Sequence, residues 1–152
     1  QRKSHLGRNH CQSCPRLGSL YPRPITCDLM ADPAEKVCER CGRAMQWRAK
    51  WARNWNEVKY CSDACRKQRL TAVDTALEDA ILQLLNARAR DASICPSEAA
   101  RAVGGESWQS LMEPARMAAR RLVAQEKAQI TQGGKVVDPS RAKGPIRIRR
   151  FQ

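Results

Sequence analysis

The chain of 152 residues has room for one ordinary domain or two small ones. Its 28 lysines and arginines against 15 aspartates and glutamates give a net charge of +13, which favours a polyanionic partner, nucleic acid before a membrane. No apolar run is long enough to span a bilayer, and no secretory signal precedes the eight cysteines. We therefore expect a cytoplasmic, bacterial protein without membrane contact, whose reduced thiols bind metal.

Residues 1–35 read as a flexible basic N-terminal extension, because they hold four prolines and show no apolar periodicity. Whether residues 1–29 belong to the native chain stays open, since Met30 is a plausible start. Three cysteines and one histidine are a legitimate zinc set, and the alternative is a tail with free thiols. We therefore expect one zinc ion and allow for a second, in a site made of His10 (or His5), Cys11, Cys14 and Cys27.

Residues 36–69 carry the clearest motif, two cysteine pairs with 19 residues between them. Cys38 and Cys41 are spaced to wrap a metal in a tight turn, for which Gly42 supplies a positive φ. Cys61 and Cys65, four apart, predict one face of a helix, with Cys61 at its start and Cys65 one turn in. Four thiolates form a closed tetrahedral zinc site. A segment so short and poor in aliphatic residues needs a bound metal to stabilise its fold.

Three tryptophans lie between the cysteine pairs, at Trp47, Trp51 and Trp55. In a helix over 46–58 they would form a buried stripe, whereas a treble clef would need a hairpin that turns at 54–56. In both cases we expect at least two of them in the core, and exposed platforms for stacking bases are the alternative. The cations beside them can contact phosphates either way: Arg48, Lys50 and Arg53.

The cysteine-rich segment contains, in order, Cys38-x-x-Cys41-Gly42-Arg43, Trp47-Arg48-x-Lys50-Trp51, Trp55 and Tyr60-Cys61-Ser62-x-x-Cys65-Arg66. With these residues it resembles a short bacterial zinc-finger family of uncharacterised function. It also looks like the treble-clef arrangement, in which a knuckle and a hairpin precede a helix that supplies two ligands. The resemblance covers about residues 36–68, and nothing is carried over to residues 9–33.

Residues 70–76 read as a linker, and residues 77–150 as a second domain in which apolar residues first recur at helical spacing. Caps, prolines and a glycine pair divide the helical part. The predicted helices are one with a capping box of Thr75 and Glu78 and an end near Arg90, one from Pro96 to Gly104-Gly105, a short one capped by Ser107, and one from Pro114 to Lys127.

Short β signals follow the helices. Gly133 and Gly134 lie between two β-prone runs and predict a hairpin turn. Ile146 and Ile148 alternate with arginines, which predicts a half-buried edge strand at the end of the domain. Helices, hairpin and a last strand are, in this order, typical of a winged helix-turn-helix. The sequence therefore predicts a zinc-stabilised treble-clef-like module followed by an α+β winged helix-turn-helix domain.

The second segment also contains Ile94-Cys95-Pro96-Ser97-Glu98, Arg101, Trp108, Leu111-Met112, Arg116, Leu122, Thr131-Gln132-x-Gly134, Asp138-Pro139 and Gly144-Pro145-Ile146-Arg147. With these residues it resembles another bacterial family of uncharacterised function, over roughly residues 77–150. The resemblance implies a winged-helix fold and no activity.

Basic residues on the last predicted helix indicate a nucleic-acid surface. Arg116, Arg120 and Lys127 share a face opposite the alanines and leucine, so we expect them to be exposed and offered to the major groove. Phosphate contacts from the hairpin and last strand are expected of Lys135, Arg147 and Arg149. Duplex DNA is the first expected partner, RNA is possible in its place, and the alternative is a merely solvated basic face.

Catalytic chemistry has little support in the sequence. The only histidines, His5 and His10, lie in the extension, and Cys95 stands alone in an apolar setting that suits a small core residue. We expect a non-catalytic DNA-binding regulator by fold analogy, without a small-molecule substrate. The alternatives are a protein-interaction adaptor, which would have a protein partner, and an accessory subunit of a nucleic-acid-processing enzyme.

Overall fold

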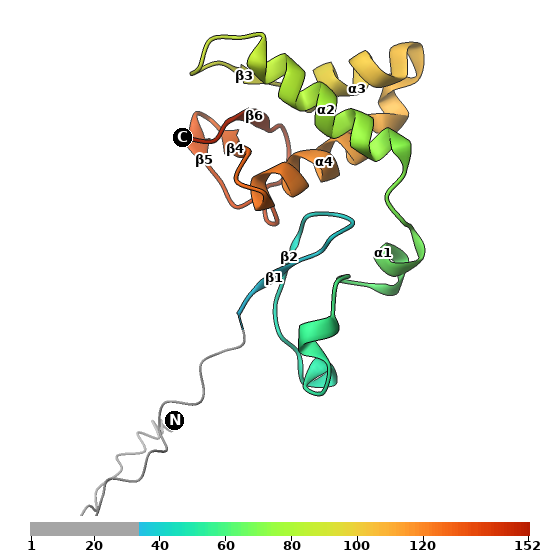
Figure 1. Cartoon of the computed structure of the whole chain (residues 1–152). Coiled ribbons are helices and arrows are strands. Elements are labelled where there is room, and N and C mark those ends of the chain that lie inside the picture. The colour runs from blue at the N-terminus through green and yellow to red at the C-terminus, as the bar shows by residue number, and fades with distance from the viewer. Residues whose placement is uncertain (1–33) are drawn as a thin grey trace, which may run out of the picture. The chain divides into compact units, whose positions relative to one another are not determined.

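The first long helix begins at a reciprocal cap rather than at the predicted one. The structure, a computed structural model, describes residues 34–152, and α2 spans Ala72–Asn86 in it (Figure 1). Thr71 accepts from the Asp74 amide at 3.4 Å, and the Asp74 carboxylate accepts from the Thr71 amide at 2.9 Å. The predicted capping box at Thr75 is therefore wrong, and most of the predicted linker at 70–76 is helix. Only residues 68–71 separate α2 from the helix before it.

The next helices follow the prolines and glycines of the sequence closely. The bounds of α3, Pro96–Gly104, confirm the predicted ones, and the turn η3 spans Gly105–Leu111. Ser107 does not cap this turn but lies inside it with non-helical dihedral angles. Helix α4 spans Met112–Ala124, so Pro114 lies in its first turn. Helix α4 ends at Ala124, so the prediction that it reaches Lys127 is wrong. Helix α2 likewise ends at Asn86, before the predicted end near Arg90.

Four short strands form an antiparallel sheet: β3 (Ser93–Ile94), β4 (Ala128–Gln132), β5 (Lys135–Val136) and β6 (Arg147–Arg150). Their order in the sheet is β3-β6-β4-β5. The hairpin turn at Gly133 and Gly134 is as predicted, with φ of 55° and 81°. The prediction of β6 as an edge strand is wrong, since it pairs with β4 on one side and β3 on the other. β3 is too short to be recognised from periodicity.

The core of this mixed α/β domain lies between the sheet and the helices α2, α3 and α4. Ile94, Ile148 and Ile130 stand side by side on three neighbouring strands and are buried. Small residues of α4 permit close packing of the helices. The helical contribution to the core is Leu77, Ile81 and Leu85 of α2, Ala99 and Ala100 of α3, and Ala115, Ala118, Ala119 and Leu122 of α4. Within the described residues, no helix is both long and apolar enough to cross a membrane.

The segment before α2 is built of short elements around a cluster of cysteines and tryptophans. An antiparallel hairpin of β1 (Lys36–Val37) and β2 (Ala44–Met45) is followed by the turns η1 (Ala49–Trp51) and η2 (Trp55–Glu57) and by the helix α1 (Asp63–Lys67). Neither the single helix over 46–58 nor a hairpin at 54–56 is present. Asn54, with φ −139° and ψ 20°, separates the two turns instead.

The tryptophans differ in burial because of these turns. Trp55 is 7% exposed and belongs to the cluster of Cys38, Cys41 and Met45. The half-buried Trp51 packs against the cluster, with its ring 5.5 Å from that of Trp55. Trp47 is 43% exposed. Two tryptophans thus contribute to this core, one fully and one in part.

Replacing Trp55 by alanine is expected to destabilise the cysteine-rich module by about 3–5 kcal/mol, because it removes the largest buried side chain of a very small core. The Lys36 ammonium would also lose its contact with the Trp55 ring, 5.5 Å away, while its hydrogen bond to the backbone carbonyl of residue 55 is retained. Thermal unfolding of the metal-loaded protein measures the effect. Trp47→Ala is the control, and a control that costs as much would contradict the assigned burial.

Candidate metal centre

Two separate segments bring four cysteines together. Cys38 and Cys41 lie in the turn of the β1–β2 hairpin, Cys61 lies just before α1, and Cys65 lies in its first turn. The four sulfur atoms are all within 4.8 Å of one another. Cys61 Sγ lies 3.6 Å from both Cys41 Sγ and Cys65 Sγ. The predicted convergence of these residues is confirmed.

The second pair reaches the cluster in a different way from the predicted one. Helix α1 begins at Asp63 with Ser62 as its cap, and the Ser62 hydroxyl accepts from the Cys65 amide at 3.2 Å. Cys65 is therefore in the first turn, but Cys61 precedes the cap and is not on the helix. The prediction that Cys61 starts the helix is wrong, because serine is much the better capping residue.

The first pair is held by a tight knuckle. The Cys38 amide donates to the Arg43 carbonyl and the Gly42 amide to the Cys38 carbonyl, both at 2.9 Å. Gly42 has the predicted positive φ, of 68°. The structure adds a second reason for glycine, because a Cβ atom here would lie 2.6 Å from Arg120 Cβ and from the Arg121 amide nitrogen. The sequence alone gives no sign of this close approach to α4.

The donor set fits a metal ion such as zinc. Thiolates about 2.3 Å from a zinc ion stand about 3.8 Å apart in a tetrahedron, close to the sulfur separations of 3.6 Å. Burial raises the pKa of the Cys41 and Cys61 thiols, and their thiol neighbours oppose the ionisation of Cys61 further. Burial also acts against ionisation of Cys38, but the amides of Cys41, Cys61 and Arg40 outweigh it and hold its pKa at about 7. Four thiolates this close need a cation to compensate their charge, and the cluster could hold one.

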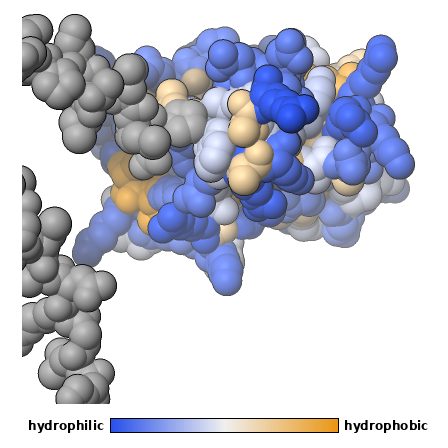
Figure 2. All heavy atoms as spheres, turned by 90° about the horizontal axis from the view of Figure 1, so that it is seen from below, coloured by the Kyte–Doolittle hydropathy of each residue, from blue (hydrophilic) through white to orange (hydrophobic). Residues whose placement is uncertain are grey.

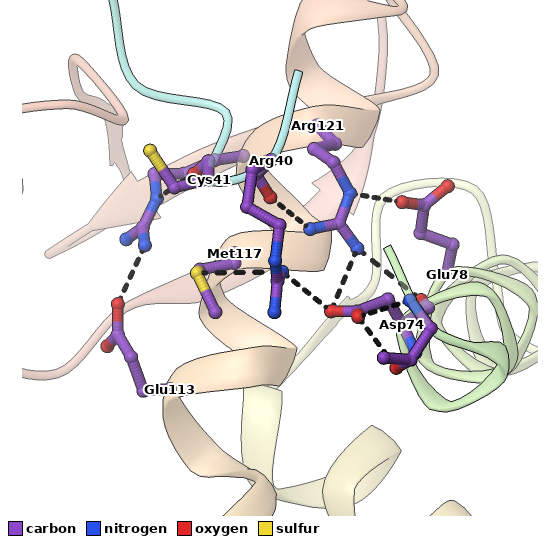
Figure 3. A network of polar contacts seen from close by, with 9 residues as sticks. Arg40, Cys41, Asp74, Glu78, Glu113, Met117 and Arg121 are labelled. Carbon is purple, nitrogen blue, oxygen red and sulfur yellow. Dashed lines mark hydrogen bonds and ion pairs between the residues drawn. The ribbon is translucent and has the colours of Figure 1, made fainter. Parts of the chain in front are cut away.

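The knuckle is bound to α4 by two buried arginines, each 5% exposed. Arg120 Nε donates to the carbonyl oxygen of Cys41, and Arg121 Nη1 donates to that of Arg40, both at 2.8 Å. Arg120 also pairs with Glu113 at 2.7 Å. Figure 3 shows Arg121 and the knuckle residues Arg40 and Cys41 meeting at α4. The peptide groups around a candidate metal ligand are therefore held by side chains of the second domain.

An ion network continues from the knuckle to α2 (Figure 3). Arg40 Nη1 lies 2.9 Å from an oxygen of Asp74, and Arg121 Nη2 lies 3.7 Å from the same oxygen. Arg121 also pairs with Glu78, the residue that the sequence assigned to a capping box. Burial acts to raise the pKa of Asp74, but the hydrogen bonds from Thr71 and the charges of Arg40 and Arg121 outweigh it and hold the pKa below its ordinary value. Asp74 is thus ionised and links helix capping to the docking of the knuckle.

Comparison with known families assigns the two halves of the chain. A family model described as "Protein of unknown function (DUF3253)" matches residues 74–151, more than half of the chain. The chain belongs to the DUF3253 family. A second family model, described as "Uncharacterized protein conserved in bacteria (DUF2256)", matches residues 31–68 and contains all four clustered cysteines. Both resemblances seen in the sequence are confirmed, and no curated protein matches the chain.

The structure corrects the expected exposure of two residues, Arg120 and Arg116, in the predicted nucleic-acid surface on the DUF3253 domain. Arg120 is not exposed as predicted, because its guanidinium is buried between Glu113 and the Cys41 carbonyl. Arg116, half-buried, donates to the Gly144 carbonyl at 3.1 Å, and Arg149, half-buried, donates to Gln129 at 3.0 Å. The exposed members of the predicted set are Arg48, Lys50 and Arg53 beside the tryptophans, and Lys127, Lys135 and Arg147 of the DUF3253 domain.

Two further predictions concern cysteines outside the cluster. The second metal site at His10, Cys11, Cys14 and Cys27, with His5 as the alternative ligand, lies outside the described residues. Cys95 is half-buried at the start of α3, where its amide donates to Glu98 at 2.8 Å. Its place at a helix cap in the DUF3253 domain gives it a structural role.

Proposed function

We propose that the protein is a non-catalytic nucleic-acid-binding protein in which zinc holds the cysteine-rich module together. Four cysteine thiolates are a preferred ligand set for structural zinc and leave no coordination position for water. The observation that carries nucleic-acid binding is the basic and aromatic surface around η1, made of the exposed Trp47, Arg48, Lys50 and Arg53 and the half-buried Trp51. We call this the tryptophan face.

The tryptophan face combines cations with aromatic rings, as surfaces that bind nucleic acids do. Lys50 Nζ lies 4.8 Å and the Arg48 guanidinium 5.6 Å from the centre of the Trp51 ring. In the described part of the chain, none of Arg48, Lys50 and Arg53 has an acidic partner within salt-bridge distance. Residues 34–70 hold ten basic and four acidic side chains, so the field around this face is positive.

Figure 2 shows the molecule from below the view of Figure 1, on the side where η1 and η2 lie, and this surface suits a charged, hydrophilic partner. Most of it is hydrophilic, and its hydrophobic areas are small apart from one patch at its left-hand edge (Figure 2). Such a surface supports contacts to phosphates more than burial against an apolar protein face.

The order of elements in the DUF3253 domain supports a winged-helix fold, with α4 in the place of the recognition helix and the β4–β5 hairpin in the wing. The knuckle covers Arg120 and Arg121 of that helix. We therefore assign the phosphate contacts to the tryptophan face and to Lys135 and Arg147, rather than to insertion of α4 into the major groove.

Binding to labelled oligonucleotides at several salt concentrations tests the function. Changing Arg48, Lys50 and Arg53 together to glutamine is expected to weaken binding to duplex DNA and to reduce the slope of log affinity against log salt by about 2.7, if each contacts one phosphate. A single-stranded DNA and an RNA of the same sequence, measured alongside, identify the preferred form.

The matched control changes Arg66, Lys67 and Arg69 to glutamine, which removes the same charge from the same module. Equal losses in the two triple variants would mean diffuse attraction and would overturn the assignment to the tryptophan face. A wild-type protein that binds none of the oligonucleotides with salt dependence would overturn nucleic-acid binding itself.

A protein-interaction adaptor, or an accessory subunit of a nucleic-acid-processing enzyme, is the second candidate. A shallow cleft of about 370 Å³ lies beside the first cysteine pair, and Val37, Leu70 and Ala124 contribute apolar surface to it. Val37 is 41% and Leu70 51% exposed, which favours a protein partner for this cleft. Crosslinking in cells, followed by identification of both protein and nucleic acid, distinguishes the candidates.

A further inference from the structure

The loop between the two cysteines of the first pair is held in place from outside its own module. Arg120 binds the carbonyl of Cys41, and Arg121 binds the carbonyl of the preceding residue, both at 2.8 Å. Both guanidinium groups are buried, and arginine keeps its charge at all relevant pH values. These are charged hydrogen bonds to the backbone of a metal ligand, and they fix the peptide planes that orient its sulfur.

Packing reinforces these hydrogen bonds. Gly42 follows the ligand Cys41 directly and lies so close to α4 that a Cβ atom would approach Arg120 Cβ to 2.6 Å. On β2, the second strand of the hairpin, the Ala44 amide donates to the Ser140 hydroxyl at 2.7 Å. Helix α4 and the segment after β5 thus both hold the knuckle hairpin. The second cysteine pair is oriented instead by the cap of its own helix, at Ser62.

We propose that the DUF3253 domain sets the metal affinity of the four-cysteine site, with Arg120 and Arg121 as positioning residues that hold the knuckle in its ligating conformation. Groups that orient metal ligands without touching the metal typically change affinity by about 10–100-fold when they are removed. By linkage, a metal ion in the site strengthens the docking of the knuckle on α4 by the same factor. This coupling between the two modules goes beyond nucleic-acid binding and does not depend on it.

Zinc affinity of the full chain tests the proposal, measured by competition with a chelator of known affinity. Arg120→Met keeps the aliphatic stem but removes the donor to Cys41, and it is expected to weaken zinc binding roughly tenfold or more. Arg120→Lys keeps the charge without the Nε donor, and we expect it to restore only part of the loss. Arg116→Met changes the same helix without touching the knuckle, and its zinc affinity should match that of the wild type.

Two further measurements separate positioning from a general loss of structure. Cobalt-loaded Arg120→Met should keep the absorption bands of a tetrahedral four-thiolate site, which shows that the ligands are unchanged while the affinity falls. Ser140→Ala removes the independent contact to Ala44 from a partly exposed loop, so it tests the coupling even where Arg120→Met does not fold. We expect it to weaken zinc binding roughly threefold.

The decisive comparison is between the docking variants and Arg116→Met. The proposal would be overturned if folded Arg120→Met and Ser140→Ala both bound zinc as tightly as the control. The zinc affinity would then be determined by the cysteine-rich module alone. A cobalt spectrum that loses its tetrahedral bands in Arg120→Met would overturn it too, because the arginine would then maintain the ligand set rather than tune its affinity.

Discussion

Removal of the metal is expected to unfold residues 36–69 and, with them, to lower the melting temperature of the DUF3253 domain. A structural zinc site supplies about 10–16 kcal/mol to the folding of its module, far more than this small core can replace. Once the knuckle unfolds, Arg120 and Arg121 lose their carbonyl partners, and Asp74 loses Arg40. Hydrogen bonds to charged groups contribute about 1.5–3 kcal/mol each to stability. In a domain of this size, each kcal/mol of lost stability lowers the melting temperature by about 4–8 °C. We therefore expect the melting temperature of the DUF3253 domain to fall by roughly 10 °C or more.

The measurement uses amide NMR spectra and thermal melts of the full chain with and without a zinc chelator, and of Cys61→Ser. Cys95→Ser is the matched control, because it makes the same chemical change outside the cluster and should leave both parts folded. An unchanged melting temperature of the DUF3253 domain after metal removal would show that the modules are stable independently of each other.

Asp74→Ala is expected to cost about 3–5 kcal/mol of unfolding free energy, because it leaves Arg40 and Arg121 buried without their shared carboxylate. The same change removes one half of the reciprocal cap, the hydrogen bond from the Thr71 amide, which adds about 1 kcal/mol. Asp74 is 3% exposed, so water cannot replace its carboxylate. Urea unfolding of the metal-loaded protein measures the loss. Asp79→Ala, at an exposed position of the same helix, is the control and should be nearly neutral.

Asp74→Asn separates the two roles, since an amide can still accept from the Thr71 backbone but carries no charge. The pH dependence gives a second test. The pKa of Asp74 is lowered in the folded state, so its contribution is fully present above the ordinary carboxyl pKa of about 3.9. That contribution disappears as the pH falls through the lower, folded pKa, and the wild type should lose it while Asp74→Ala has none to lose. An Asp74→Ala protein as stable as Asp79→Ala would contradict the buried network.

The sequence predicts the parts of this fold that depend on local chemistry. Cysteine spacing, the proline of α3 and the glycine pair of the β-hairpin each indicate a local geometry, and the structure confirms these. The errors arise where two residues satisfy the same local rule. Thr71 and Thr75 are both followed three residues later by an acid. In the structure Asp74 caps α2 with Thr71, whereas Glu78 pairs with Arg121, a contact distant in sequence.

Helical periodicity cannot predict the role of Arg120, for a related reason. Helical spacing separates the charged face of α4 from its alanine face correctly, but it treats every charged face as exposed to solvent. Carbonyl oxygens of another segment are equally good acceptors for guanidinium groups, and no local pattern indicates them.

The connection between α1 and α2 has a consequence for how the two modules behave when they separate. Only residues 68–71 join Lys67 to Ala72, and four extended residues reach about 14 Å at most. A released knuckle therefore stays tethered near α4 at an effective concentration of the millimolar order that short linkers give. Redocking is then a first-order event whose rate is independent of protein concentration, and a second molecule at cellular concentration competes poorly for the same face of the helix.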